Sequence, residues 1–541
     1  MQRNMLTRCV IFCGCIILQS WFAMSCSTSC ICFKKGNVFC FGETITEIPK
    51  DIPSNTTELL VLETHVNLID NITFIKYEDL EKLVLLKNKI KYIHEDAFKF
   101  LRRLTDLEIS ATPLSQLKSG LFDEQLEIEK LAVIYNEIKD LPCGLFLNNK
   151  KLKMLSLHGN KIVGICKDAF VNLALLEELN LSSNDINEIP PGLFKALKKL
   201  KILKLNNNQI RKLYPDLFAD LRELTELTLQ VNTITNVLKY TFASLVSLEK
   251  LNLMSNSIKV LSPEVFSSLS RLSFLSLERN QLEDLPNGIF NSTESLTMLS
   301  LAKNKLKTIP GNMFSSLAKI EKIVLSYNQI EKLEENIFNG LDSATHLNLD
   351  NNNISFIDSN VFSHMNSLNV ITLHQNLLTT VPKGLFEDLY QLHTLLLHSN
   401  PLSCNCSLSY FLKWLKDNKE EIHVSDTECV EPQKYRGKTI QSLKKQDLEC
   451  PVLASNPDSR PYPLLKNSQH VENTHIPSCN HHLTEEGILQ FTCDLIVCSS
   501  MDIQISVWQE SSTSTFIHSP VNIQPNCAIT KVNVTINTGT T

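Results

Sequence analysis

The chain is 541 residues long, with 43% hydrophobic and 20% charged residues and a formal net charge of −6. This composition is typical of a globular protein, and the length exceeds that of one compact domain. A mildly acidic chain offers no electrostatic reason to expect binding to nucleic acid or to an anionic membrane surface.

The N-terminus predicts a secretory signal peptide over residues 1–25. Arg3 and Arg8 precede an apolar run, and the small residues Ala23 and Ser25 fit a small-x-small cleavage site. The alternative is a membrane anchor, but the run is short for a membrane span and contains Gln19. No second apolar run of that length follows, so we expect a secreted protein without a membrane span.

Cysteine usage favours an oxidising, extracellular compartment. Three of the 17 cysteines, Cys9, Cys13 and Cys15, would leave with the signal peptide. The other 14 are even in number and clustered, as is typical of disulfide-bonded proteins. Asparagine-linked glycosylation is predicted at seven sequons: Asn55, Asn71, Asn180, Asn291, Asn353, Asn405 and Asn533.

A 24-residue repeat occupies residues 56–402. Asparagine recurs at every 24th position up to Asn400, except that threonine stands at Thr64 and Thr112. We call these positions, 64 to 400 in steps of 24, the ladder positions. A phenylalanine follows ten residues after each of them, through Phe386. A period held this strictly predicts a solenoid, here of about fifteen units.

Each unit, such as "LKILKLNNNQI" at residues 200–210, alternates leucine with other residues and so predicts a short strand. Stacked in register, these strands form a parallel sheet. The chain must turn sharply after the strand, and the asparagine amide is expected to satisfy the backbone groups buried there. The phenylalanine segments carry Pro and Gly, and they predict irregular or short 3-10 structure on the far side of each coil.

These units resemble the 24-residue class of the leucine-rich repeat family, whose members are curved solenoids that bind partners on the concave face. The resemblance implies a cysteine-rich N-terminal cap over residues 26–55 and a C-terminal cap over residues 403–451 with Trp414 in its core. The family commonly has Trp and Asp where this chain has Leu402 and Asn405. The disulfides that the resemblance implies are Cys26–Cys32, Cys30–Cys40, Cys404–Cys429 and Cys406–Cys450.

Two more cysteines lie in adjacent coils of the repeat region. Cys143 and Cys166 follow their ladder positions by seven and six residues, which places both on the irregular side. A disulfide between them is predicted, and two free buried thiols are the alternative.

The periodicity stops after the C-terminal cap. Residues 452–478 are rich in proline and serine and predict a linker. Strand-like runs such as "ILQFTCDLIV" and "ITKVNVTI" then predict a small disulfide-tied β module over residues 479–541. The pairing of its four cysteines stays open: Cys479, Cys493, Cys498 and Cys527.

The repeat count, the cap pattern C-x-C-x-L-x-Y-x-x-x-W-L and the module spacing C-x13-C-x4-C-x28-C together resemble the regulatory subunits of carboxypeptidase N. That resemblance implies a plasma glycoprotein that does no chemistry. It would bind and stabilise the catalytic subunit, a zinc carboxypeptidase. The alternative is a secreted carrier or matrix protein with the same fold and another extracellular partner.

Two side-chain groups could be mistaken for metal or catalytic sites. His482 and Glu485 match the metal-binding start of zinc carboxypeptidases, but they sit in a small module, and a solvated turn is the preferred interpretation. Asp350, His374 and His398 share one exposed position in consecutive repeats, and the outer two lie too far apart for one metal ion. They predict a solvated polar stripe or a pH-sensitive partner surface. No catalytic residue, cofactor site or metal site is expected.

A partner surface is predicted near Phe274 and Met298, which hold the same outward position in consecutive repeats. Met254 also faces outward one repeat earlier, and Tyr327 lies at the rim. Exposed apolar clusters often mark partner sites. The alternative is that a glycan or the curve of the sheet covers them. A sugar at Asn180, on the same face, would bar a partner from that zone.

Overall fold

The computed structural model describes residues 24–27, 30–33, 36–418 and 420–448. It also describes the backbone of five later strands: β28 (Ser478–Leu483), β29 (Ile488–Val497), β30 (Gln504–Gln509), β31 (Ser512–His518) and β32 (Ala528–Asn537). The chain forms two compact units, Met1–Val452 and Leu453–Thr541. Among the described residues, no helix is long and apolar enough to span a bilayer.

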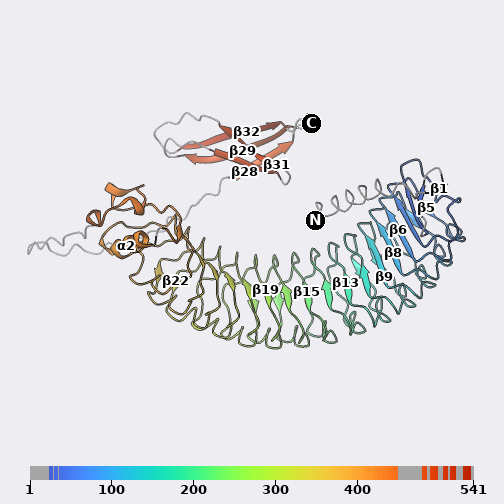
Figure 1. Ribbon diagram of the computed structural model, residues 1–541, viewed down its shortest axis with the longest axis horizontal. Helices are drawn as coiled ribbons and strands as arrows, with labels where there is room; N and C mark the ends of the chain where they lie inside the picture. Colours follow the sequence, from blue (N-terminus) through green and yellow to red (C-terminus); the bar gives the residue numbers. More distant parts are fainter. Residues whose placement is uncertain are drawn as a thin grey trace, which may run out of the picture. The chain divides into compact units, whose positions relative to one another are not determined.

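The predicted solenoid is confirmed: one sheet follows the inner side of a curved coil of about fifteen turns (Figure 1). In this sheet every strand from β3 to β27 runs parallel to its neighbour, and within the repeats partners in register lie 24 residues apart. The strands of this sheet are β1 (Met24–Ser27), β2 (Cys30–Cys32), β3 (Asn37–Phe41), β4 (Glu58–Leu62), β6 (Lys82–Leu86), β8 (Asp106–Ser110), β9 (Lys130–Ile134), β11 (Met154–Ser156), β13 (Glu178–Asn180), β14 (Ile202–Lys204), β15 (Glu226–Thr228), β17 (Lys250–Asn252), β19 (Phe274–Ser276), β20 (Met298–Ser300), β21 (Lys322–Val324), β23 (His346–Asn348), β25 (Val370–Thr372), β26 (Thr394–Leu396) and β27 (His423–Val424).

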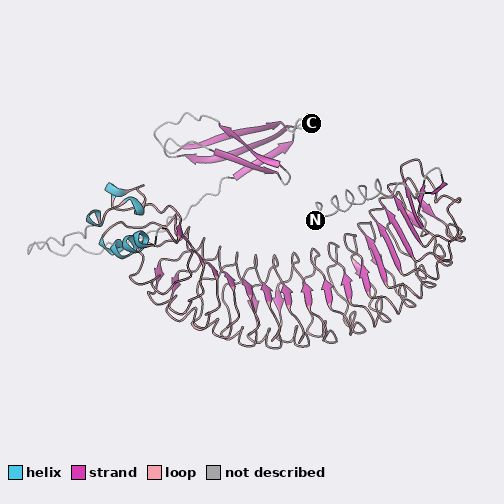
Figure 2. Ribbon diagram, in the orientation of Figure 1, coloured by secondary structure: helices cyan, strands magenta, loops and turns pink. Residues whose placement is uncertain are grey.

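Strand length changes along the solenoid. The strands β4, β6, β8 and β9 have five residues each, whereas those from β11 to β26 have three (Figure 2). Short parallel pairs lie on the flank of the coil: β5 (Leu68–Ile69) with β7 (Tyr92–Ile93), β10 (Asp140–Leu141) with β12 (Gly164–Ile165), β16 (Asn236–Val237) with β18 (Val260–Leu261), and β22 (Lys332–Leu333) with β24 (Phe356–Ile357).

A buried amide links each coil to the one before it. Asn184 is 6% exposed, and its Nδ2 donates to the carbonyl oxygens of Leu157 and Leu181 at 3.0 and 3.1 Å. Its Oδ1 accepts from the N–H of Ile162 at 3.0 Å. Thr112 fills the same place differently, because its hydroxyl donates to Asn136 Oδ1 at 2.7 Å. The ladder positions therefore satisfy the backbone groups that the turn buries.

The residue before each ladder position adopts a left-handed backbone conformation. Ser183 has a φ of 55°, and Gly159 has a φ of 71°. A positive φ recurs at this place in all fifteen repeats, from Glu63 to Ser399, and fourteen of these residues are not glycine. Such a conformation is uncommon for residues with a Cβ. The sequence pattern did not predict this recurrence.

Phenylalanine rings fill the far side of the coil. Phe74 to Phe386 recur every 24 residues, and the neighbouring rings from Phe74 to Phe170 and from Phe194 to Phe386 stack with centroids 5.9–6.5 Å apart. The column ends at the C-terminal cap, where the ring centroid of Phe386 lies 5.1 Å from that of Trp414 and 6.1 Å from that of Phe411. The sequence predicted either irregular structure or short 3-10 helices on this convex side. In the described repeats it consists of turns and contains no 3-10 helix.

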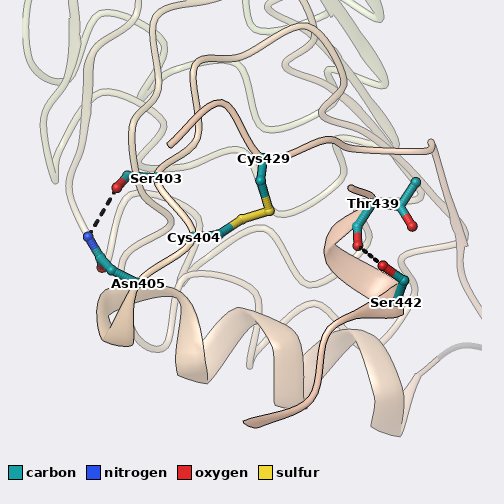
Figure 3. The surroundings of a disulfide bond; sticks show 6 residues. All are labelled: Ser403, Cys404, Asn405, Cys429, Thr439 and Ser442. Carbon is teal, nitrogen blue, oxygen red and sulfur yellow. Dashed lines mark hydrogen bonds between the residues drawn. A yellow bond between two sulfur atoms is a disulfide. The ribbon is translucent and has the colours of Figure 1, made fainter. Parts of the chain in front are cut away.

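The described residues of the C-terminal cap form one α-helix, α2 (Ser409–Asp417), whose buried residues include Phe411 and Trp414. Cys404 is bonded to Cys429 in this cap, and Asn405 Nδ2 donates to Ser403 Oγ at 3.1 Å (Figure 3). The 3-10 helices of the described residues are all in this cap: η1 (Cys406–Leu408), η2 (Gln433–Tyr435), η3 (Ile440–Ser442) and η4 (Lys445–Asp447).

Disulfides join the other described cysteines. Cys30 is bonded to Cys40 in the N-terminal cap. Cys143 is bonded to Cys166 across adjacent coils, which excludes two free thiols. Cys32 and Cys406 are also disulfide-bonded. The side chains of their predicted partners, Cys26 and Cys450, lie outside the described residues.

Replacement of Asn184 by alanine is expected to destabilise the solenoid by about 1–3 kcal/mol, because two carbonyl groups and one N–H lose a buried partner. Urea unfolding of the variant measures this loss. Asn187→Ala is the matched control, since Asn187 is an exposed amide of the same repeat. Equal unfolding midpoints for Asn184→Ala and the parent would show that the ladder amide is dispensable.

The register of the C-terminal module predicts its disulfides. Cys479 and Cys493 are direct partners in the antiparallel pair β28–β29, where Cα separations suit a disulfide. Cys498 follows Val497, Cys527 precedes Ala528, and these two neighbours are partners in β29–β32. Non-reducing peptide mapping should therefore recover Cys479–Cys493 and Cys498–Cys527. Recovery of Cys479 with Cys498 or Cys527 would contradict the register.

Candidate functional site

The concave face is formed by three outward residues of each repeat, which lie six, four and two places before the ladder position. The residues between them point into the core: Leu275 and Leu277, for example, are fully buried. Because side chains alternate along a strand, the outward residues do not take part in the core that closes the coil. This face therefore can vary in chemistry from repeat to repeat, and it does so in three regions.

The central region contains the predicted partner residues. Phe274 and Met298 are partners in register between β19 and β20, and both are half-buried. Met254 is half-buried as well, one repeat earlier. Tyr327 is 51% exposed, and Lys303 Nζ lies 5.5 Å from its ring centroid. The structure thus places Met254, Phe274 and Met298 on neighbouring repeats of one face, with Phe274 and Met298 side by side, whereas Tyr327 directly precedes its ladder position.

The N-terminal region holds a larger apolar group that the sequence analysis missed. In the register of β3, β4 and β6, Phe39, Leu60 and Val84 form one row of outward side chains, and Phe41, Leu62 and Leu86 form a second. We call these six residues the N-terminal apolar cluster. The signal was present at outward positions, but "ELLVL" and "KLVLL" are apolar on both faces. Without alternation, a strand pattern does not separate outward from inward residues.

The C-terminal region carries Asp350, His374 and His398 in one row. The imidazole rings of the two histidines are stacked with centroids 4.6 Å apart, and His374 Nε2 lies 3.8 Å from Asp350 Oδ2. Ser326 and Thr372 donate to Asp350 Oδ1 at 2.7 and 2.6 Å. Among the described residues, no three acidic, histidine or cysteine side chains are arranged to hold one metal ion.

The two kinds of acid–base group in this row titrate differently. Burial favours the neutral carboxyl of Asp350, but hydrogen bonds from Ser326, Thr372 and Asn351 outweigh it and lower the pKa of Asp350. Burial lowers the pKa of His374, and the neighbouring His398 adds to this, while Asp350 opposes it. At neutral pH the row therefore combines an ionised carboxylate with an uncharged His374 imidazole.

A second histidine network lies around the Asn180 sequon. His158 Nδ1 is 2.7 Å from Ser182 Oγ, and His158 Nε2 is 3.0 Å from the Tyr135 hydroxyl. Burial lowers the pKa of His158, an effect that the Ser182 carbonyl opposes and Lys204 reinforces. Ser182 is only 4% exposed and donates to Asn180 Oδ1 at 2.6 Å. This hydroxyl is therefore a buried structural group, poorly placed to attack a substrate.

The other candidate metal-binding pair from the sequence, His482 and Glu485, lies mostly outside the described residues. His482 belongs to β28, opposite Gln490 in β29, and only the backbone of both is described. Glu485 lies outside the described residues.

Comparison with known proteins agrees with this architecture. The leucine-rich repeat family model matches residues 127–186, 175–234, 222–282, 275–330, 294–354 and 342–402, which together cover just over half of the chain. The chain belongs to the leucine-rich repeat family. Solenoids of this kind present extended concave surfaces that bind other proteins.

Two relatives from different mammals have the same name. Carboxypeptidase N subunit 2 of Mus musculus is 33% identical over 156 residues, which is 27% of this chain and 28% of the relative. The Homo sapiens protein of the same name is 32% identical over 129 residues, or 23% of this chain and 24% of that one. The chain therefore spans about a quarter of the length of the relatives it matches.

Solved structures share the fold. A leucine-rich repeat protein of Leptospira interrogans has a TM-score of 0.60 and 25% identity, over 70% of this chain and 93% of that one. The Toll–Spatzle complex of Drosophila has a TM-score of 0.53 and 22% identity, over 73% of this chain and 64% of that one. The second likeness is one of fold alone.

The lowered pKa of His374 predicts a pH-dependent stability. The unfolded chain binds a proton at this residue near the ordinary histidine pKa, but the folded chain does so only at lower pH. Stability is thus fully present above the ordinary pKa and is lost as pH falls through it toward the lowered value. The urea midpoint of the parent should fall more between pH 7.5 and 5.5 than that of His374→Gln.

The control for this comparison is His65→Gln, which removes an exposed histidine. His158 is present in all three proteins, so its contribution cancels. An identical pH dependence of the parent and His374→Gln would contradict the assignment.

Proposed function

We propose that this protein is a secreted, non-catalytic scaffold that binds and stabilises the catalytic subunit of carboxypeptidase N in plasma. The observation that carries the proposal is the sequence similarity to carboxypeptidase N subunit 2 from two mammals. The disulfides between described cysteines support an extracellular location. The seven sequons support a glycoprotein, and an exposed site for a sugar exists at Asn55, Asn291 and Asn353.

The solenoid is suited to stabilising a bound enzyme without taking part in its chemistry. A partner that binds only the folded state of an enzyme raises the free energy of unfolding of that enzyme by mass action. The stacked coils give a rigid face on which such contacts need little ordering. Within the described residues, the serine hydroxyl that is hydrogen-bonded to a histidine ring is that of Ser182, which is buried.

The docking surface of this proposal includes Phe274 and Met298, with Met254 and Tyr327 beside them. A half-buried aromatic ring next to a methionine offers apolar contact area that is already ordered in the free protein. Polar groups surround the pair: Lys303 Nζ lies 3.2 Å from Glu278 Oε1. Apolar centres within polar rims are the usual anatomy of a binding hot spot.

The experiment mixes the purified chain with the purified catalytic subunit of carboxypeptidase N. We expect a complex by size-exclusion chromatography with light scattering, and a higher melting temperature of the catalytic subunit in the complex. If the parent chain neither binds nor stabilises that subunit, the proposal is wrong. A secreted carrier or matrix protein with another extracellular partner then becomes the better explanation.

A double variant, Phe274→Ser with Met298→Ser, tests the docking surface within that experiment. It should weaken binding by at least about tenfold, as loss of a hot-spot pair does. Leu238→Ser with Val260→Ser is the matched control, because these apolar residues are 50% and 67% exposed and belong to the flank of the coil rather than to its concave face. Unchanged affinity of a well-folded Phe274/Met298 variant removes this pair from the interface.

A further inference from the structure

We infer that the N-terminal apolar cluster, Phe39, Phe41, Leu60, Leu62, Val84 and Leu86, is a second contact region for the same partner. It would take an apolar, uncharged segment that protrudes from the catalytic subunit. This inference rests on the proposed function for the identity of the partner, but its surface is separate from Phe274 and Met298. The arrangement, the rim charges and the curvature of the sheet each support it.

The cluster is continuous over three hydrogen-bonded strands. Leu60 lies between Phe39 and Val84 in register, and Leu62 lies between Phe41 and Leu86. Neighbouring strands are about 4.8 Å apart, so the side chains of each row are in van der Waals reach of one another. Phe41 is 57% exposed, Phe39, Leu60, Leu62 and Leu86 are half-buried, and Val84 is buried, with 8% of it exposed. Two outward rows of purely apolar residues do not recur in three successive strands elsewhere on the described concave face.

The end of the cluster is sharp. In β8 the outward positions next to Val84 and Leu86 are occupied by Glu108 and Ser110. Ser110 Oγ donates to Glu108 Oε1 at 2.6 Å, so this pair is already satisfied. The apolar area therefore ends at β8, whereas toward β2 it continues to Ile31, the register partner of Phe39. A contiguous apolar patch on a soluble protein marks an interaction site more often than scattered single residues do.

The rim shows what kind of group fits. Along one side, Asn37 Nδ2 donates to Glu58 Oε2 at 3.2 Å, and Lys82 Nζ lies 3.6 Å from Asp106 Oδ2. Along the other side, Lys87 Nζ lies 2.7 Å from Glu63 Oε1. The lysines are ion-paired within the chain, whereas Glu58 accepts from the neutral amide of Asn37. A charged group placed over the six apolar side chains themselves would lose its hydration without gaining an ion pair.

The curvature decides the shape of the occupant. The cluster lies on the inner side of the coil (Figure 1). A second copy of this chain would present the same concavity, and two concave faces leave a gap between them. A protruding helix or loop from a globular enzyme fills such a surface. The three strands span about 10 Å, which is less than a whole interface needs, so the cluster acts as an anchor within a larger contact.

The spacing allows one partner to reach both regions. Ladder positions 88 and 280 are eight repeats apart. At about 4.8 Å per repeat on the inner face, β6 and β19 are separated by about 38 Å, which is within the diameter of an ordinary enzyme domain. Asn180 lies in the repeat midway between these positions. A sugar there would divide the contact into two parts, one on each side.

The test uses the double variant Phe41→Ser with Leu62→Ser and the purified catalytic subunit of carboxypeptidase N. We expect affinity to fall by at least about tenfold, because two neighbouring apolar anchors are lost from the second row. The matched control is Leu68→Ser with Tyr92→Ser: these residues are 48% and 41% exposed and pair in register on the flank of the first two repeats. The control variant should bind as the parent does.

A second measurement needs no variant. Hydrogen exchange of the parent chain should slow in β3, β4 and β6 when the catalytic subunit is bound. If the cluster variant folds poorly, the hydrogen exchange of these three strands alone tests whether the cluster contacts the partner. The inference is wrong if the parent binds tightly but these strands gain no protection, or if a folded cluster variant binds as tightly as the parent. Either result leaves the proposed function standing. Absence of any binding by the parent instead refutes the proposed function.

Discussion

The buried amide after each strand is the interaction on which the rest of the solenoid depends. At this point the chain leaves the sheet, and carbonyl groups of two successive coils point into the core. Asn184 donates to both of them and accepts from a third backbone group, so one side chain ties two coils together. The preceding residue must adopt a positive φ to place the amide there, as Ser183 does. Hydrogen bonding as well as apolar packing therefore holds successive coils in register.

Because of that constraint, one set of residues maintains the fold and a different set is free to bind partners. The inward leucines and the ladder position are occupied by the core, and the phenylalanine column closes the far side of each coil. The outward residues of the strands are left to vary. They form an apolar cluster around Leu62, a mixed region around Phe274 and a row of acid and imidazole groups from Asp350 to His398. One rigid frame thus carries three different surfaces.

The sequence predicted the frame better than the surfaces. A strict period revealed the coil, the parallel sheet and the role of Asn184, because each depends on one residue type at one place. It also put Asp350, His374 and His398 in a single row, and the two imidazole rings are stacked. The positive φ before each ladder position went unnoticed, since fourteen of the fifteen residues there are not glycine. The N-terminal apolar cluster went unnoticed too, because its strands are apolar on both faces and alternation is lost.

The separation between two surfaces of a solenoid is set by the number of repeats between them. Each coil contacts only its neighbours, so a change at Leu62 does not reach Phe274 through the core. Two regions on this face are coupled only through a partner rigid enough to touch both, in which case the second contact forms at a high effective concentration. Their separation is then a fixed number of coils, held by the amide ladder on one side and by the stacked rings on the other. Insertion of one whole repeat between them would move the regions apart by about 5 Å while leaving each intact. A defect at a single ladder position acts differently, because it loosens the spacing itself and so weakens every contact that depends on the frame.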